Sequence, residues 1–175
     1  DLMVGNLGVF LLGATVATAD LADTDVDWRT AGALTVLGLI YAFKVMWLAP
    51  AVLLLVAARR WRHLACLALG LGIVAALSAL QPAMVGDWLA RIQWVRQNFP
   101  DSLDFVSLAP WFYPVAVVTW LVIAIRAIRH SPEAAWLVGC LSLFAWPRLA
   151  PYSFVLALPP VFFLLRRYPP RRVIL

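Results

Sequence analysis

Long apolar runs constrain this chain more than any other feature. Of its 175 residues, 64% are hydrophobic and 13% are charged. A soluble domain of this length needs more charge to cover its surface, whereas the bilayer core admits only helices or closed barrels. The apolar residues do not alternate with polar ones, which argues against a barrel. We therefore expect an all-α, polytopic transmembrane helix bundle that forms a single domain.

The runs predict about six membrane helices, since about 20 apolar residues cross a bilayer. We expect them within residues 2–19, 31–58, 64–80, 111–128, 134–146 and 152–165. The second run is too long for a straight helix across a core about 30 Å thick, and it contains Lys44 and Pro50. We expect it to break into two short helices near Lys44, while one tilted helix remains the alternative.

Smaller signals refine this arrangement. Small residues in the first run predict close helix packing, namely Gly5, Gly8, Gly13 and Ala17. In the segment 81–110, apolar residues recur at helical spacing, which predicts an amphipathic helix in the membrane interface; they are Val85, Trp88, Ile92 and Val95. Ser131, Pro132 and Glu133 form a typical helix start.

The charges predict an orientation. The net charge is +5. The arginines cluster at the ends of apolar runs, so we interpret them as signals of membrane orientation. This placement argues against nucleic acid as a partner. With Arg59–Arg62 inside, each later span reverses the chain. The clusters near Arg129 and at the C-terminus then also lie inside, as the positive-inside rule requires. We expect a multi-pass protein of the cytoplasmic membrane with a cytoplasmic C-terminus. The topology of residues 1–58 stays open.

Tryptophans near the predicted span ends are typical of an aromatic belt at the membrane surface. They are Trp28, Trp61, Trp88, Trp94, Trp111 and Trp146. His63 and His130 flank arginines at the inner ends, so we expect them beside lipid headgroups. Cys66 and Cys140 lie in apolar runs, and no spacing indicates a metal or a cofactor.

Lys44 is the only lysine, and it lies far from either end of its apolar stretch. An ammonium there costs about 2.5–3.5 kcal/mol, so it should face a cavity or a counter-ion. A lipid phosphate would supply that counter-ion, and a snorkelling lysine at a helix break is the alternative. Arg148, in a predicted outer loop, is a second phosphate candidate because guanidinium binds phosphate through paired hydrogen bonds. A simple interface anchor is the alternative.

Other polar residues carry weaker signals. Asn6, inside the first run, is expected to make an interhelical hydrogen bond. Asp87, Asp101 and Asp104 lie in the outer segment and are candidate general bases by location, although loop carboxylates are more often merely solvated.

The order of these features resembles the C-terminal part of glycosyltransferase family 87, whose members are multi-span enzymes of the GT-C superfamily. The resemblance covers most of the chain. It depends on short motifs in a fixed order, which are Gly5-Asn6-Leu7, Ala31-Gly32, Phe43-Lys44, Arg59-Arg60-Trp61-Arg62, Pro147-Arg148-Leu149-Ala150-Pro151-Tyr152 and Pro159. Family members usually have proline after the lysine, where this chain has Val45.

The resemblance implies a transferase that moves a sugar, often mannose, from a polyprenyl-phosphate donor to an extracytoplasmic or lipid-linked acceptor. Lys44, Arg148, Tyr152 and Asn6 would then contribute to the binding of substrate and lipid phosphate. The catalytic aspartate of such enzymes lies in the first outer loop, upstream of the matched region, so we expect the general base before residue 1. This segment alone is then expected to be inactive. The alternative is a non-catalytic membrane subunit that packs against partner subunits or binds membrane lipids.

Overall fold

The described chain is helical except for one pair of two-residue strands. The structure, a computed structural model, describes residues 2–42, 47–98, 103–104, 111–142, 148–149 and 158. Its elements in chain order are α1 Leu2–Ala22, α2 Trp28–Ala42, α3 Leu48–Ala57, α4 Trp61–Ala79, α5 Pro82–Asn98, β1 Leu103–Asp104, α7 Phe112–His130, α8 Pro132–Cys140 and β2 Arg148–Leu149. The all-α fold class is therefore confirmed for this part of the chain.

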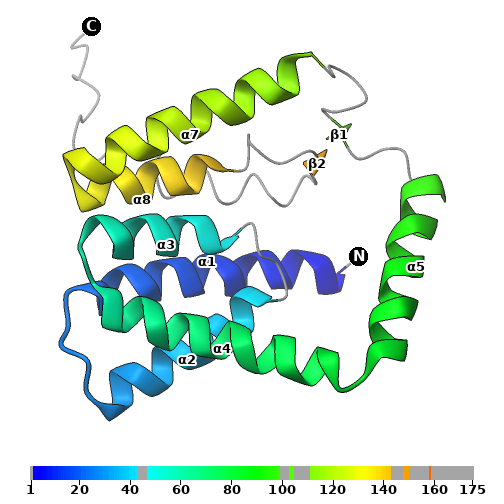
Figure 1. Ribbon diagram of the computed structural model, residues 1–175, viewed down its shortest axis with the longest axis horizontal. Coiled ribbons are helices and arrows are strands. Elements are labelled where there is room, and N and C mark those ends of the chain that lie inside the picture. Colours follow the sequence, from blue (N-terminus) through cyan, green and yellow to red (C-terminus); the bar gives the residue numbers. More distant parts are fainter. Residues whose placement is uncertain are drawn as a thin grey trace, which may run out of the picture.

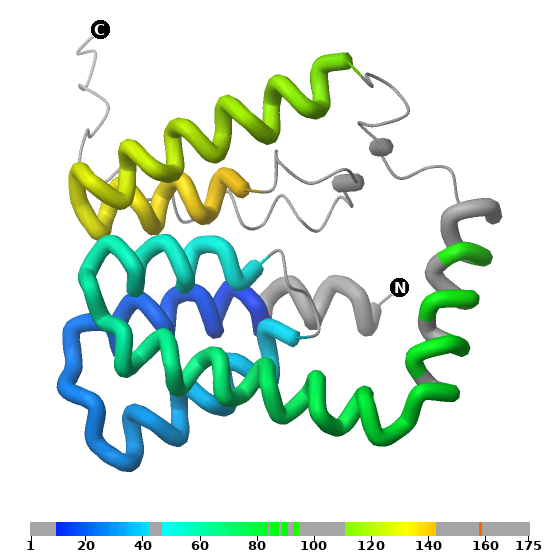
Figure 2. The backbone as a smooth tube through the Cα atoms, in the orientation of Figure 1, coloured from blue at the N-terminus to red at the C-terminus, as the bar shows by residue number. Residues whose placement is uncertain are grey.

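Most of the helices lie side by side along one direction, while α5 runs across one end of the bundle (Figures 1 and 2). The most extensive contacts join α2 to α4 and α3 to α8, and α7 packs on α8. β1 and β2 pair antiparallel, with Leu103 opposite Leu149 and Asp104 opposite Arg148. This pairing joins two segments that the predicted topology places on the same outer side.

Among the described residues, two helices have the length and composition to cross a membrane, α4 and α7, each with 19 residues. At 1.5 Å per residue each extends about 28 Å, close to the thickness of a bilayer core. Only 17% of the apolar window of α4 and 11% of that of α7 are buried, whereas the core helix of a soluble protein is mostly buried. The exposed side chains along them include Leu69, Ile73, Leu77, Val118, Leu121 and Ile125.

The predicted break near Lys44 is confirmed as two separate helices, since α2 ends at Ala42 and α3 begins at Leu48. Residues 43–46 lie outside the described residues. The helix start at Ser131 is confirmed too, because its hydroxyl oxygen accepts a hydrogen bond from the Ala134 N–H at 3.0 Å and Pro132 occupies the first helical turn. The predicted last span, 152–165, lies outside the described residues except for Leu158.

Glycines let two pairs of helices approach closely. A Cβ on Gly38 of α2 would collide with the Leu67 carbonyl oxygen of α4, and one on Gly70 would collide with the Thr35 carbonyl oxygen of α2. Likewise, a Cβ on Gly139 of α8 would overlap the backbone of Pro50 in α3. By contrast, a Cβ on Gly13 would meet no atom of the described residues within 4 Å, so the close packing that Gly13 allows does not occur against them.

The turn from α3 to α4 has an unusual backbone. The N–H of Arg60 donates to the Leu55 carbonyl at 2.8 Å, and the N–H of Arg59 donates to the Val56 carbonyl at 3.1 Å. This pattern is a Schellman motif, in which the residue after the helix cap takes a left-handed conformation and is usually glycine. Here that residue is Arg59, with φ 55°. A left-handed arginine costs roughly 1–2 kcal/mol, a strain that glycine avoids.

The loop between α1 and α2 is tied to the start of α4. His63, only 2% exposed, donates a hydrogen bond from Nε2 to the Thr24 carbonyl at 3.0 Å. The ring of His63 therefore packs under the loop, and its place beside lipid headgroups stays a prediction. His130 is exposed, as expected. The contact also places the acidic loop beside the arginines of the α3–α4 turn, at the same end of the bundle.

Asp27 caps α2, and its capping interaction should depend on pH. Its Oδ1 accepts a hydrogen bond from the Thr30 N–H at 2.7 Å, which lowers its pKa below the ordinary value of 3.8. A lowered pKa in the folded state means that this stabilisation is present above about pH 4 and is lost as the pH falls further. We expect Asp27→Ala to speed exchange of the Thr30 amide by about fivefold at neutral pH, measured by hydrogen exchange in micelles.

Asparagine is the matched control for this cap, because its side chain also accepts the hydrogen bond but does not titrate. Asp27→Asn should keep its protection at all acidic pH values, whereas the wild type should lose protection below about pH 4 once rates are corrected for intrinsic exchange. Equal protection in all three proteins would show that the cap contributes nothing.

Candidate functional site

Of the four predicted site residues, none has a described side chain. Lys44 and Tyr152 lie outside the described residues. Asn6 lies on α1 and Arg148 on β2, where the backbone alone is described. The ladder nevertheless places Arg148 directly opposite Asp104, one of the predicted outer carboxylates.

The ends of three helices lie in one buried cluster. Gly38, one turn before the end of α2, packs against Leu67 and Gly70 in the middle of α4. The start of α3 packs on the end of α8 through Pro50 and Gly139. Because α3 has 10 residues and α8 has 9, each extends only about 15 Å, half the thickness of a bilayer core. We call this meeting point the mid-bundle junction.

The mid-bundle junction is closely packed and contains polar groups. Tyr41, Trp47 and Cys140, at the three helix ends, are all fully buried. Thr18 donates its hydroxyl hydrogen to the Ala14 carbonyl at 2.8 Å, so the Tyr41 hydroxyl donates to Thr18 Oγ1 at 3.0 Å. The indole N–H of Trp47 has no hydrogen-bond partner among the described residues. Such an unpaired donor is costly in an apolar interior.

The helix ends add backbone charge to the junction. α2 and α8 end there and α3 begins there, so two negative dipole ends and one positive end converge. Broken helices of this kind are tolerated at membrane depth only where they are buried in protein or line a cavity, and transporters use them to bind ions and anionic groups. In sequence, Lys44 falls between the two helix ends that α2 and α3 contribute.

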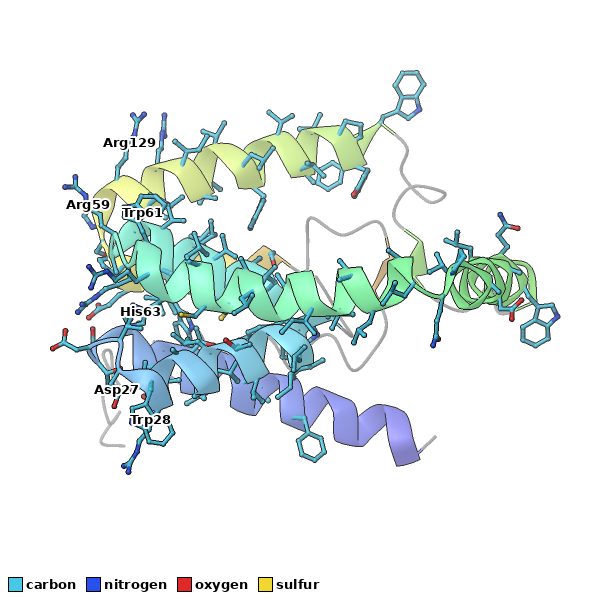
Figure 3. The ribbon with its side chains drawn as sticks, turned by 60° about the horizontal axis from the view of Figure 1, so that its bottom comes forward. Asp27, Trp28, Arg59, Trp61, His63 and Arg129 are labelled. Atoms are coloured by element: carbon cyan, nitrogen blue, oxygen red, sulfur yellow. The ribbon has the colours of Figure 1, made fainter. Side chains whose placement is uncertain are left out.

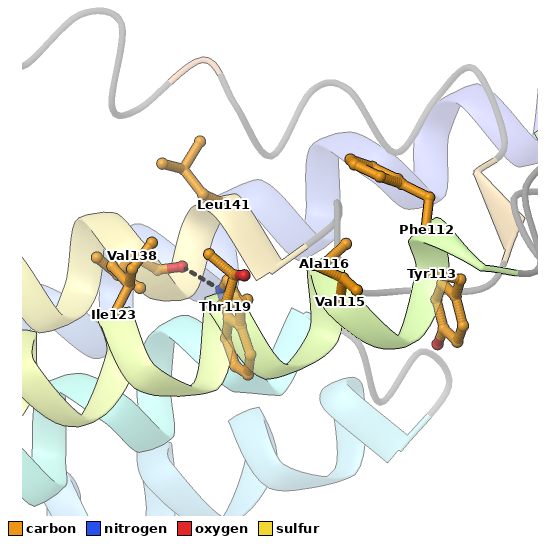
Figure 4. Close-up of a pocket in the computed structure, with 9 residues that line it drawn as sticks. Phe112, Tyr113, Val115, Ala116, Thr119, Ile123, Val138 and Leu141 are labelled. Carbon is orange, nitrogen blue, oxygen red and sulfur yellow. Dashed lines mark hydrogen bonds between the residues drawn. The ribbon is translucent and has the colours of Figure 1, made fainter.

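A second feature is an apolar groove between α7 and α8 (Figure 4). Its volume is about 560 Å³, and its lining is almost wholly apolar. The Trp120 indole N–H donates to the Val138 carbonyl at 3.1 Å, which fixes the two helices against each other beside it. The groove extends toward the start of α7, the end at which α5 also lies (Figure 1). Its lining residues are Phe112, Tyr113, Val115, Ala116, Thr119, Trp120, Ile123, Val138 and Leu141.

Sequence reasoning missed the mid-bundle junction and the groove. In the sequence, Tyr41, Trp47 and Cys140 look like ordinary members of apolar runs. The contact between α3 and α8 joins residues some ninety positions apart in the chain, so no local pattern indicates it. The one signal of the junction in the sequence is the pair Lys44 and Pro50, which predicts the break between α2 and α3. It does not predict which helices pack against that break. Trp28, Trp61, Trp94 and Trp111 are all exposed, as a tryptophan belt requires.

Comparison with known proteins adds no relative. The chain matches no protein-family model, no curated protein and no solved structure. The resemblance to glycosyltransferase family 87 therefore stays a prediction.

Proposed function

We propose that this chain is the polytopic membrane part of a transferase that moves a sugar from a polyprenyl-phosphate donor to an extracytoplasmic or lipid-linked acceptor. The mid-bundle junction is the observation that carries the proposal. It joins half-length helices beside the segment that contains Lys44, at the depth where an ammonium needs an anionic partner. The donor phosphate would be that partner.

The proposal includes a bundle of about six membrane helices in the cytoplasmic membrane. Two helices, α4 and α7, support it through their length and exposure. α1 adds a further apolar helix, and α2 together with the half-length α3 would enter the membrane and return to the same side. α5, whose Val85, Leu89 and Trp94 are exposed, would lie in the outer interface. The arginines of the α3–α4 and α7–α8 turns would face the cytoplasm, and so would the C-terminus.

The groove between α7 and α8 would suit the polyprenyl chain of such a donor. A polyprenyl chain is a flexible hydrocarbon, and burying it in an apolar groove contributes about 0.8 kcal/mol per CH₂ group. The groove opens toward lipid along α7, whose Val115 and Val118 are exposed. The donor would therefore place its chain on α7 and its phosphate toward the bundle.

Transfer of a labelled sugar from polyprenyl phosphate by the intact protein in membranes tests this function. Filling the groove with Ala116→Trp should raise the KM for the donor about tenfold, because the bulky ring occupies the space of several methylene groups. Val122→Trp is the matched control, since Val122 lies on the same helix, is exposed and does not line the groove. It should leave the KM unchanged.

Two results would contradict the proposal. If the intact wild-type protein in membranes transfers no sugar from the donor, the chain is not part of such an enzyme, and a non-catalytic membrane subunit becomes the better account. If Ala116→Trp and Val122→Trp behave alike, the groove does not hold the prenyl chain.

A further inference from the structure

We infer that the arginine-lined cavities at the α3–α4 turn bind the phosphate headgroup of an anionic phospholipid. The inference goes beyond sugar transfer: it needs the bundle to lie in a membrane, but it does not need the chain to be an enzyme. The site lies at the end of the bundle opposite α5 (Figure 3).

Two neighbouring cavities share one arginine. The first, of about 370 Å³, is lined by Asp25, Val26, Arg59, Arg60, Trp61, Arg62 and His63. The second, of about 340 Å³, is lined by Val56, Ala57, Arg59, Ile128, Arg129, His130, Ser131 and Pro132. Arg59 therefore belongs to both, and guanidinium groups from the α3–α4 turn and from the end of α7 surround the same region.

The charge in this region is unbalanced. Three arginines and a single aspartate line the first cavity. In the part of the chain that the structure describes, no carboxylate forms an ion pair with Arg59, Arg60 or Arg62. A guanidinium offers five N–H donors in a planar fork that matches phosphate, so these arginines can bind an anion although the acidic α1–α2 loop lies beside them.

The start of α4 strengthens the attraction for an anion. Its N-cap residue is Arg60, no side chain caps the helix, and its first turn contains no acidic residue. The free N–H groups and the positive dipole end therefore add to the arginine charges. The arginine charges are repelled by the positive end of the helix dipole. A bound phosphate would be attracted both by this dipole end and by the arginines.

Arg59 occupies a position where glycine is the favoured residue. Its φ of 55° places it in the left-handed region at the end of α3. Glycine would form this turn without strain. Strain of this kind marks positions where the side chain has a role that the local fold does not require, and the position of Arg59 between both cavities identifies that role as anion binding.

The surroundings favour a lipid headgroup over a soluble anion. Trp28 and Trp61 are largely exposed at this end of the bundle, where an aromatic belt marks the headgroup level (Figure 3). The exposed apolar faces of α4 and α7 lead away from the cavities. A phospholipid could therefore place its phosphate among the arginines and its acyl chains along these helices.

Native mass spectrometry of the intact protein released from nanodiscs tests the inference. The nanodiscs contain equal amounts of phosphatidylglycerol and phosphatidylcholine, and the measurement counts the lipids retained. The wild type should retain phosphatidylglycerol preferentially. Arg59→Gly combined with Arg62→Gln should lower this preference by roughly 30-fold, because each arginine that meets an anionic headgroup contributes about fivefold. Arg59→Gly also relieves backbone strain, so loss of the fold would not explain the result.

Arg126→Gln is the matched control, since it removes one exposed arginine from the last turns of α7 without touching either cavity. It should keep the lipid preference. Equal retention of both lipids by the wild type, or an equal loss in the control, would overturn the inference. Displacement of phosphatidylglycerol by millimolar inorganic phosphate would overturn the assignment to a headgroup and identify a free-phosphate site. None of these results depends on sugar transfer.

Discussion

Replacing Gly70 with alanine is expected to lower the free energy of unfolding by about 2–3 kcal/mol, because an added Cβ cannot be accommodated at the α2–α4 crossing. The new atom would collide with the Thr35 carbonyl oxygen and lie 2.9 Å from the Cα of Gly38. Both obstacles are backbone, so no side chain can rotate away. In a membrane, helices associate mainly through such close packing and interhelical hydrogen bonds.

If Gly70→Ala pushes α2 and α4 apart, one hydrogen bond between the two helices would also be lost. Thr35 Oγ1 lies 3.3 Å from the Cys66 carbonyl oxygen of α4, besides bonding the Ala31 carbonyl of its own helix. Separation of α2 from α4 would also move the end of α2 at the mid-bundle junction. Gly70→Ala is therefore expected to reduce any activity of the junction together with the stability.

Gly72→Ala is a matched control on the same helix, since a Cβ on Gly72 would meet no described atom within 4 Å. It should be neutral or slightly stabilising, because alanine is the better helix former. The free energies are measured by denaturant titration in mixed micelles, followed by circular dichroism. Equal stability of the two variants would mean that α2 and α4 do not cross at Gly38 and Gly70.

Removal of the predicted phosphate ligands should have the largest effect on sugar transfer. Lys44→Met and Arg148→Ala are each expected to lower kcat/KM for the polyprenyl-phosphate donor on the order of 30-fold. A hydrogen bond to a charged group is worth about 1.5–3 kcal/mol, and each tenfold in affinity corresponds to about 1.4 kcal/mol. Methionine keeps the length of Lys44 without its charge, so the packing of the segment changes little.

Arg148→Lys and Arg126→Gln make this test specific. Lysine keeps the charge of Arg148 but not its paired hydrogen bonds, so an intermediate rate is expected. Arg126 is exposed near the opposite end of the bundle, and its loss should leave transfer unchanged. Normal amounts of each variant in the membrane are required for the comparison. Unchanged transfer in both Lys44→Met and Arg148→Ala would remove these two residues from the site.

The local features of the fold could be predicted because they depend on neighbours in sequence. The break near Lys44, the helix start at Ser131 and the helix over 82–98 all follow from short patterns of polarity, proline and capping residues. Gly13 shows the limit of such patterns. Small residues permit a close approach between helices, but the partner helix decides whether one occurs, and no described helix comes within 4 Å of a Cβ at Gly13.

The sequence by itself determined that the chain is helical and strongly apolar, that its second long run is broken, and that arginines cluster at the ends of its helices. Apolar periodicity, helix capping and charge clusters depend on residues that are close in sequence. Their structural consequences can therefore be predicted without knowledge of the tertiary structure. Only the tertiary structure decided that Gly38 meets Gly70, that three helix ends converge beside Tyr41 and Trp47, and that Arg59 is held in a left-handed turn between two cavities. These features depend on contacts between distant segments, whose geometry depends on how the whole bundle packs.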